Sequence, residues 1–215
     1  MDPTDPIIQL VVSSRVGETA RLNVHRGVLC KSSEFFQNAV KPEWTTEGER
    51  VVNLPEDSAP LVTGYVKWLY HDKITIKLYE ARKHTTEERA DEAEKVFILL
   101  AEAYVFGEKI IDAKYKNAVI ETIIAACEAS SWNMGPESVS IAYEGTPPGS
   151  PLRRMIAESI AYKAFVDSKE GVGWLHFIEG YPRDVLVDAL KAMVRVRPKP
   201  SGKLCPSVYW YLEKA

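Results

Sequence analysis

The chain has 215 residues, 46% of them hydrophobic and 27% charged, which is the composition of a globular protein large enough to bury a core. Its net charge of −3 argues against nucleic acid as a partner, and its three scattered cysteines form neither a disulfide framework nor a zinc pattern. The first residues lack the features of a signal peptide, and no apolar run approaches the roughly 20 residues of a membrane span.

The first third of the chain carries the strand signals. A β-rich run at 7–14 and an alternating run at 20–24, separated by a turn that contains Gly17, predict a β-hairpin. Two short helices are expected across 25–40, with Ser32 or Ser33 as the N-cap of the second.

Two further strands and a helix are expected between residues 51 and 78. The strands are predicted at 51–54 and at 73–78. Asp57 or Ser58 can cap the helix between them, and Pro60 is tolerated in its first turn. Four apolar residues of this helix share one face at helical spacing: Leu61, Tyr65, Trp68 and Leu69.

Helices alone are expected after this point. The charged stretch 79–95 is interpreted as an insertion or the polar start of the next helix, which continues to Gly107 and is apolar nearly all round. Further helices are predicted from Asp112, around 138–143, from Ser150, and across 181–196 with an inward face of Leu186, Ala189, Leu190 and Met193. This order predicts an α+β domain followed by an all-α C-terminal region.

The segment from Asn23 to Val40 holds His25 and Cys30, which raises the question of a nucleophilic pair. Such a pair needs the two side chains within hydrogen-bond reach and a third group that orients the base. His25 and Cys30 are five residues apart across a helix start, which places them on opposite sides of one turn. We therefore predict that His25 is structural, that Cys30 is a small buried hydrophobe and that the neighbouring phenylalanines are core.

No cofactor or metal site is predicted. The four histidines have no metal-ligand spacing, and the glycines form no phosphate-binding loop. Arg153 and Arg154, at the start of an amphipathic helix, are interpreted mainly as its solvated face and are also candidate contacts for an acidic partner.

The first 126 residues resemble a BTB/POZ domain. The pattern of that family after its second strand is matched at fixed offsets by Val24, His25, Arg26, Leu29, Ser32, Phe35 and Phe36. The end of a later helix, Trp68-Leu69-Tyr70, also matches, and the resemblance covers about residues 7–126. With residues 127–215 as a helical region, the chain is similar to the BTB proteins common in filamentous fungi.

The resemblance implies a non-enzymatic protein–protein interaction module with a short β-sheet capped by a helical cluster. The partner is unknown, and a cullin-type ubiquitin ligase scaffold is a candidate. Adaptor domains of this family often carry a hydrophobic-x-Glu step, which would start here at Trp44, although the nearest acid, Glu47, stands one place late. These two residues are therefore candidate partner contacts.

Two alternatives and two further expectations stand beside this resemblance. A Skp-like or elongin-like adaptor subunit is the alternative in the same fold group, and an uncharacterised enzyme is the alternative outside it. Residues 1–6 are too short for the N-terminal helix that BTB dimers exchange, so a monomer or weak homodimer is expected. An odd number of separated cysteines favours a reducing compartment, the cytoplasm or the nucleus.

Overall fold

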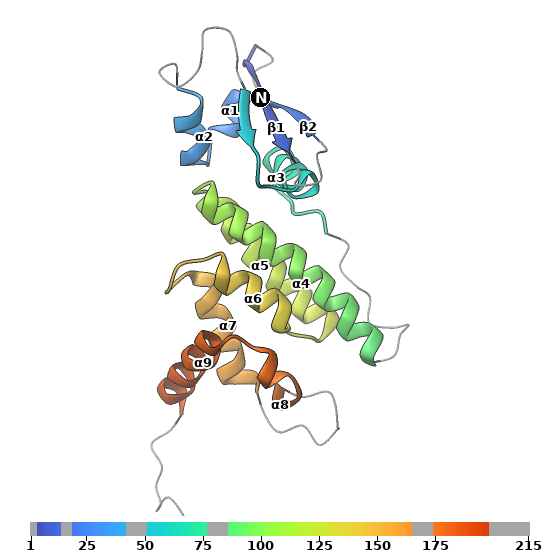
Figure 1. The fold of residues 1–215 in the computed structure, drawn as a ribbon, viewed down its shortest axis with the longest axis vertical. Helices are drawn as coiled ribbons and strands as arrows, with labels where there is room; N and C mark the ends of the chain where they lie inside the picture. Colours follow the sequence, from blue (N-terminus) through green and yellow to red (C-terminus); the bar gives the residue numbers. More distant parts are fainter. Residues whose placement is uncertain (1–3, 14–18, 42–50, 77–85, 165–173, 198–215) are drawn as a thin grey trace, which may run out of the picture.

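The computed structural model describes residues 4–13, 19–41, 51–76, 86–164 and 174–197. Within these ranges the chain is an α+β protein with a helical C-terminal region, as the order of sequence signals predicts. Its elements follow one another along the long axis of the molecule, with the sheet at one end and the last helices at the other (Figure 1).

The three strands form one sheet with β1 (Ile7–Ser13) in the centre. β2 (Thr19–His25) pairs with β1 antiparallel, so that Leu22 lies opposite Leu10. β3 (Val51–Leu54) pairs with the other edge of β1 in parallel. The two paired strands of the predicted hairpin and the predicted strand at 51–54 are confirmed, while the predicted turn with Gly17 lies outside the described residues. Every second side chain of β1 is buried, as a strand with one face on the core requires: Ile8, Leu10 and Val12.

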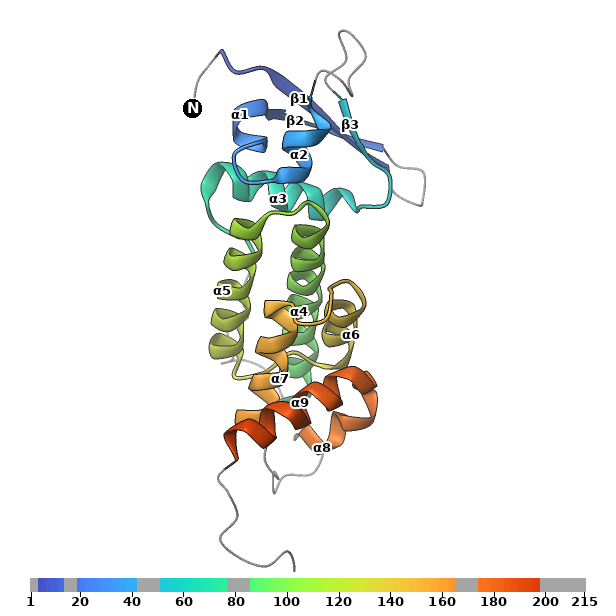
Figure 2. The same ribbon diagram turned by 90° about the vertical axis from the view of Figure 1, so that its left-hand side faces the viewer.

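Three helices cover the sheet: α1 (Arg26–Leu29), α2 (Glu34–Ala39) and α3 (Ala59–His71) (Figure 2). Of the alternative caps, Ser33 begins α2 by accepting from the backbone N–H of Phe36, and Ser58 begins α3 by accepting from that of Leu61. These caps fix the residues at which the two helices begin on the face of the sheet that they cover.

The remaining helices form the C-terminal part of the fold. α4 (Thr86–Lys109) and α5 (Ala113–Ser130) pack as a helical hairpin below α3, and α6 (Pro136–Glu144) packs on α4 (Figure 2). α7 (Pro151–Lys163) packs on α9 (Arg183–Val196), with the short α8 (Trp174–Phe177) between them in sequence. No helix in the described ranges is both long and apolar enough to cross a membrane. The expected domain boundary after Ala126 falls inside α5.

The predicted strand at 73–78 is wrong for the part that the structure describes. Lys73 lies in a bend, residues 74–76 have no regular secondary structure, and residues 77 and 78 lie outside the described ranges. The alternation of Ile74 and Ile76 therefore reflects partial packing on the core, because no described strand offers them a hydrogen-bonding ladder.

Gly107 does not end its helix, because α4 continues to Lys109. A Cβ atom at Gly107 would lie 2.7 Å from Cγ of Lys116, so this glycine allows α5 to pass close to α4. The chain reverses instead at Ile111, whose φ of 54° is left-handed. The polar stretch after residue 85 is confirmed as the start of this helix, but its apolar residues are not all buried, since Leu99 is 51% exposed.

The inward face predicted for the last helix is partly wrong. Leu190 is 62% exposed, whereas Val185, Ala189 and Ala192 are buried. Two alanines on the packed face let α9 approach α7 closely, which turns the larger side chain of Leu190 toward solvent.

Candidate functional site

His25 is tied to the end of α3. Its Nδ1 atom lies 2.7 Å from the hydroxyl oxygen of Tyr70, and its backbone N–H donates to the same oxygen at 3.0 Å. The hydroxyl can donate its proton to Nδ1 or accept from Nδ1–H, because a hydroxyl oxygen has two acceptor sites and the backbone N–H fills one. The pair joins the last residue of β2 to α3, 45 residues later in the chain.

Cys30 contacts a different part of the fold. Its thiol lies 3.8 Å from the carbonyl oxygen of Phe36, and the side chain is half-buried rather than buried as predicted. Burial raises the pKa of the Cys30 thiol, although the charge of Arg26 acts in the opposite direction. The hydrogen bonds of His25 and Cys30 thus go to two separate partners.

We call the segment from Asn23 to Val40 the motif. Its two adjacent serines, Ser32 and Ser33, meet the turn between α4 and α5, which we call the 110–112 turn. Ser32 donates to a carboxylate oxygen of Asp112 at 2.7 Å, and Ser33 donates to the carbonyl of Ile110 at 2.6 Å. The backbone N–H groups of Glu34 and Phe35, at the start of α2, also point at carbonyls of this turn. The motif therefore fastens the sheet end of the molecule to the helical hairpin.

Asp112 is the centre of this connection and is fully buried. One carboxylate oxygen accepts from Ser32 and from the hydroxyl of Tyr65 at 2.9 Å, while the other accepts from the backbone N–H of Tyr115 at 3.0 Å and so caps α5. One side chain thereby joins the α1–α2 segment, α3 and α5, and both of its carboxylate oxygens accept hydrogen bonds.

The aromatic and aliphatic positions of the motif lie in the core around this network. Leu29 and Phe36 are fully buried, and Phe35 is partly buried with its ring 5.1 Å from that of Phe36. Trp68 packs against the rings of both Tyr65 and Tyr115, and its buried indole N–H has no hydrogen-bond partner among the described residues.

Of the four residues predicted as partner contacts, two are placed by the structure and two are not. Trp44 and Glu47 lie outside the described residues. Arg153 is not on a solvated face, because its guanidinium donates to Thr146 Oγ1 and to the carbonyls of Tyr143 and Thr146, and lies 4.6 Å from the Tyr143 ring. Arg153 thus holds the loop between α6 and α7, while Arg154 is exposed.

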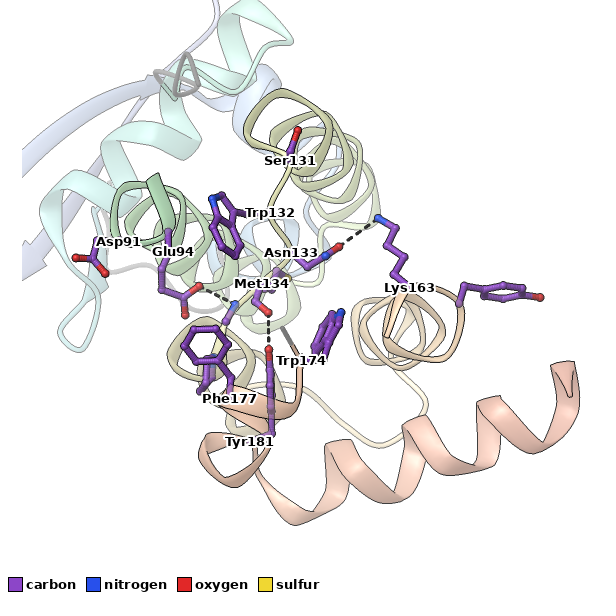
Figure 3. A pocket seen from close by; sticks show the side chains of 14 residues that line it. Asp91, Glu94, Ser131, Trp132, Asn133, Met134, Lys163, Trp174, Phe177 and Tyr181 are labelled. Atoms are coloured by element: carbon purple, nitrogen blue, oxygen red, sulfur yellow. Dashed lines mark hydrogen bonds between the residues drawn. The ribbon is translucent and has the colours of Figure 1, made fainter. Parts of the chain in front are cut away.

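A cavity of about 620 Å³ lies far from the motif, between α4, the 131–135 segment, the end of α7 and α8 (Figure 3). Its volume is in the range of ligand-binding pockets. Five aromatic side chains line it, of which Tyr162 is largely exposed: Trp132, Tyr162, Trp174, Phe177 and Tyr181. Sequence reasoning missed this site, and its one signal was the presence of tryptophans in otherwise polar or glycine-rich stretches, "SSWNM" and "GVGWLHF".

Among the described residues, no cluster of three or more histidine, cysteine or acidic side chains could hold a metal ion. The chain matches no protein-family model and no curated protein sequence. The contacts described above are therefore the basis for proposing a function.

The two described cysteines are expected to react slowly in the folded protein. Burial raises the pKa of Cys127 to about 11, which leaves roughly 100-fold less thiolate than an ordinary thiol of pKa 9.0. In a Cys205→Ser background, alkylation by iodoacetamide at pH 7.5 should be at least tenfold slower in buffer than in denaturant for both thiols. The rate for Cys127 should rise about tenfold per pH unit between pH 7 and 9. Rapid stoichiometric labelling of native Cys30 would contradict its structural assignment.

Proposed function

We propose that the chain is a non-enzymatic protein–protein interaction module of the BTB type, followed by a helical C-terminal region. The observation that carries this proposal is the use of the motif side chains. His25, Ser32 and Ser33 each direct their polar atoms at partners that hold the fold together. Residues engaged in this way fix the position of helices and support a scaffold role for the segment.

Exposed apolar side chains on α9 add support. Val187, Leu190 and Val194 are 41%, 62% and 69% exposed and recur at helical spacing on one side of the helix. Apolar side chains gathered on a surface are a feature of protein–protein contact sites. A protein ligand is thus the class of partner that suits the α9 end of the molecule.

A cullin-type ubiquitin ligase scaffold is the specific partner class that the resemblance suggests. The test uses the full chain, immobilised and incubated with the purified N-terminal region of a cullin, with binding followed by interferometry. We expect binding that falls at least tenfold in the double variant W44A/E47A, with the exposed Glu144→Gln on α6 as a matched control. Equal binding by the variant and the wild type would remove these two residues from the interface.

The broader proposal is tested separately. Affinity capture from an extract of the source cells, followed by mass spectrometry, should recover specific proteins with the full chain. Catalytic turnover of a hydrolase or transferase substrate that disappears in a folded His25→Ala variant would overturn the proposal.

Sedimentation equilibrium should show a monomer, or a dimer that dissociates at micromolar concentration.

A further inference from the structure

The cavity lined by Trp132, Trp174, Phe177 and Tyr181 has a chemical character that the proposed function does not use. The aromatic rings come from separate elements: the 131–135 segment, α8, and the residue after the 3-10 helix Ile178–Gly180. The rings of Trp174 and Tyr181 lie 5.6 Å apart and are tilted by 30°, so they form one wall (Figure 3). Ring faces carry negative electrostatic potential, and a wall of them attracts cations.

Two carboxylates stand on the α4 side of the same cavity. Glu94 is partly buried, Asp91 is exposed, and both line the space with the aromatic rings. Within the described residues Glu94 has no ion pair, so no side-chain cation neutralises this carboxylate beside the cavity. The negative charge of Glu94 contributes to the raised pKa of Tyr181, after the larger effect of burial. The one lining lysine, Lys163, is exposed, and its ammonium donates to Asn133 Oδ1 at 3.2 Å.

The groups that face the cavity are held in place before any ligand arrives. Glu94 accepts from the backbone N–H groups of Gly135 and Ser138 and from the Ser138 hydroxyl, at 2.7 to 3.0 Å. The hydroxyl of Tyr181 donates to the carbonyl of Met134 at 3.0 Å. A fixed carboxylate and a fixed ring lose little conformational entropy on binding, which favours affinity.

We propose that this cavity binds an organic cation, specifically a quaternary or methylated ammonium group. Such a group combines a positive charge, which the ring faces and the two carboxylates attract, with methyl groups that suit an aromatic lining. Anionic ligands are disfavoured by Glu94 and Asp91. The proposal goes beyond the proposed interaction function, and either can fail without the other.

The ammonium group can belong to a free small molecule or to a methylated lysine of another protein. Choline serves as the probe for the first source, and a short peptide with one trimethyllysine serves for the second. The neutral isostere of choline, 3,3-dimethylbutan-1-ol, has the same shape without the charge. Binding of each compound to the full chain is measured by calorimetry and by tryptophan fluorescence.

We expect choline or the trimethyllysine peptide to bind at least tenfold more tightly than the neutral alcohol, which corresponds to about 1.4 kcal/mol. If the trimethyllysine peptide binds at least tenfold more tightly than both choline and the unmodified peptide, the site is assigned to a protein side chain. If the trimethyllysine peptide and choline bind with equal affinity, the site is assigned to a free cation. If neither choline nor the trimethyllysine peptide binds more tightly than the neutral alcohol, or if neither cation gives a signal, the proposal is overturned.

Substitutions of lining residues test whether the cation binds in this cavity. Trp174→Leu should weaken cation binding at least tenfold, and Asp91→Asn, at an exposed position that leaves the fold intact, should weaken it at least twofold. Glu144→Gln removes an exposed carboxylate that does not line the cavity and should leave the affinity unchanged. If Trp174→Leu remains folded by circular dichroism and binds as tightly as the wild type, the cation binds elsewhere and the proposal fails.

Discussion

Replacement of Asp112 by alanine is expected to lower the free energy of unfolding by about 3 kcal/mol, the largest effect we expect from a single substitution outside the apolar core. The fully buried carboxylate accepts from Ser32, from the hydroxyl of Tyr65 and from the backbone N–H of Tyr115. Alanine removes the N-cap of α5 and leaves the buried Tyr65 hydroxyl without its acceptor. Urea unfolding followed by circular dichroism at pH 7 measures the loss.

Asp112→Asn is the matched control within the network. Its Oδ1 atom can still accept from the backbone of Tyr115, whereas the amide nitrogen cannot accept from the two hydroxyls. We expect about half the loss seen with alanine, on the order of 1.5 kcal/mol. Asp91→Ala, at an exposed position of α4, should stay within about 0.5 kcal/mol of the wild type. An alanine variant at position 112 that unfolds within 1 kcal/mol of the wild type would show that the network contributes little.

The elements around this network were predictable because their signals are local. A β-rich run marks β1, alternating apolar and polar residues mark β2, and a serine three residues before a buried phenylalanine marks the start of α2. Such patterns depend on a few neighbouring residues, so the chain alone displays them. The limits of prediction appear where a local signal has a distant cause, as at Gly107, which reads as a helix end but serves the close approach of α5.

The partners of the motif could not be predicted from the same patterns. Ser32 and Asp112 are 80 residues apart, and nothing in the sequence of either segment specifies that they meet. The cavity is a stronger case, because its lining comes from α4, the 131–135 segment, α7 and α8. Each of these segments contributes one to a few side chains, and only their packing turns scattered tryptophans into a site.

Raising the pH above 10 is expected to unfold the protein steeply. Burial, reinforced by the charge of Asp112, raises the pKa values of Tyr65 and Tyr115 well above the ordinary value for tyrosine. The folded state keeps both hydroxyls protonated, while the unfolded chain loses these protons above a pKa of about 10. The unfolded state therefore binds fewer protons at high pH, and stability must fall as the pH rises.

The size of this effect follows from the same linkage. Stability is fully present below about pH 9 and then falls by about 1.4 kcal/mol per pH unit for each buried tyrosine. Tyr65 and Tyr115 together give a slope of roughly 2.7 kcal/mol per pH unit, and Tyr143 and Tyr181, whose pKa values are also raised by burial, steepen it. A domain with 5–15 kcal/mol of stability would unfold within a few pH units.

Urea unfolding at pH 9, 10 and 11, together with the tyrosinate absorbance at 295 nm, tests this expectation. Absorbance of the buried tyrosines should rise in one step with the loss of circular dichroism, because these rings ionise only on unfolding. Tyr65→Phe should reduce the slope above pH 10 by about 1.4 kcal/mol per pH unit, whereas Tyr162→Phe, at a 71% exposed ring, controls for the loss of one hydroxyl. If all tyrosines ionise gradually while the circular dichroism stays native, the hydroxyls around Asp112 are accessible to solvent. The buried network would then need a different description.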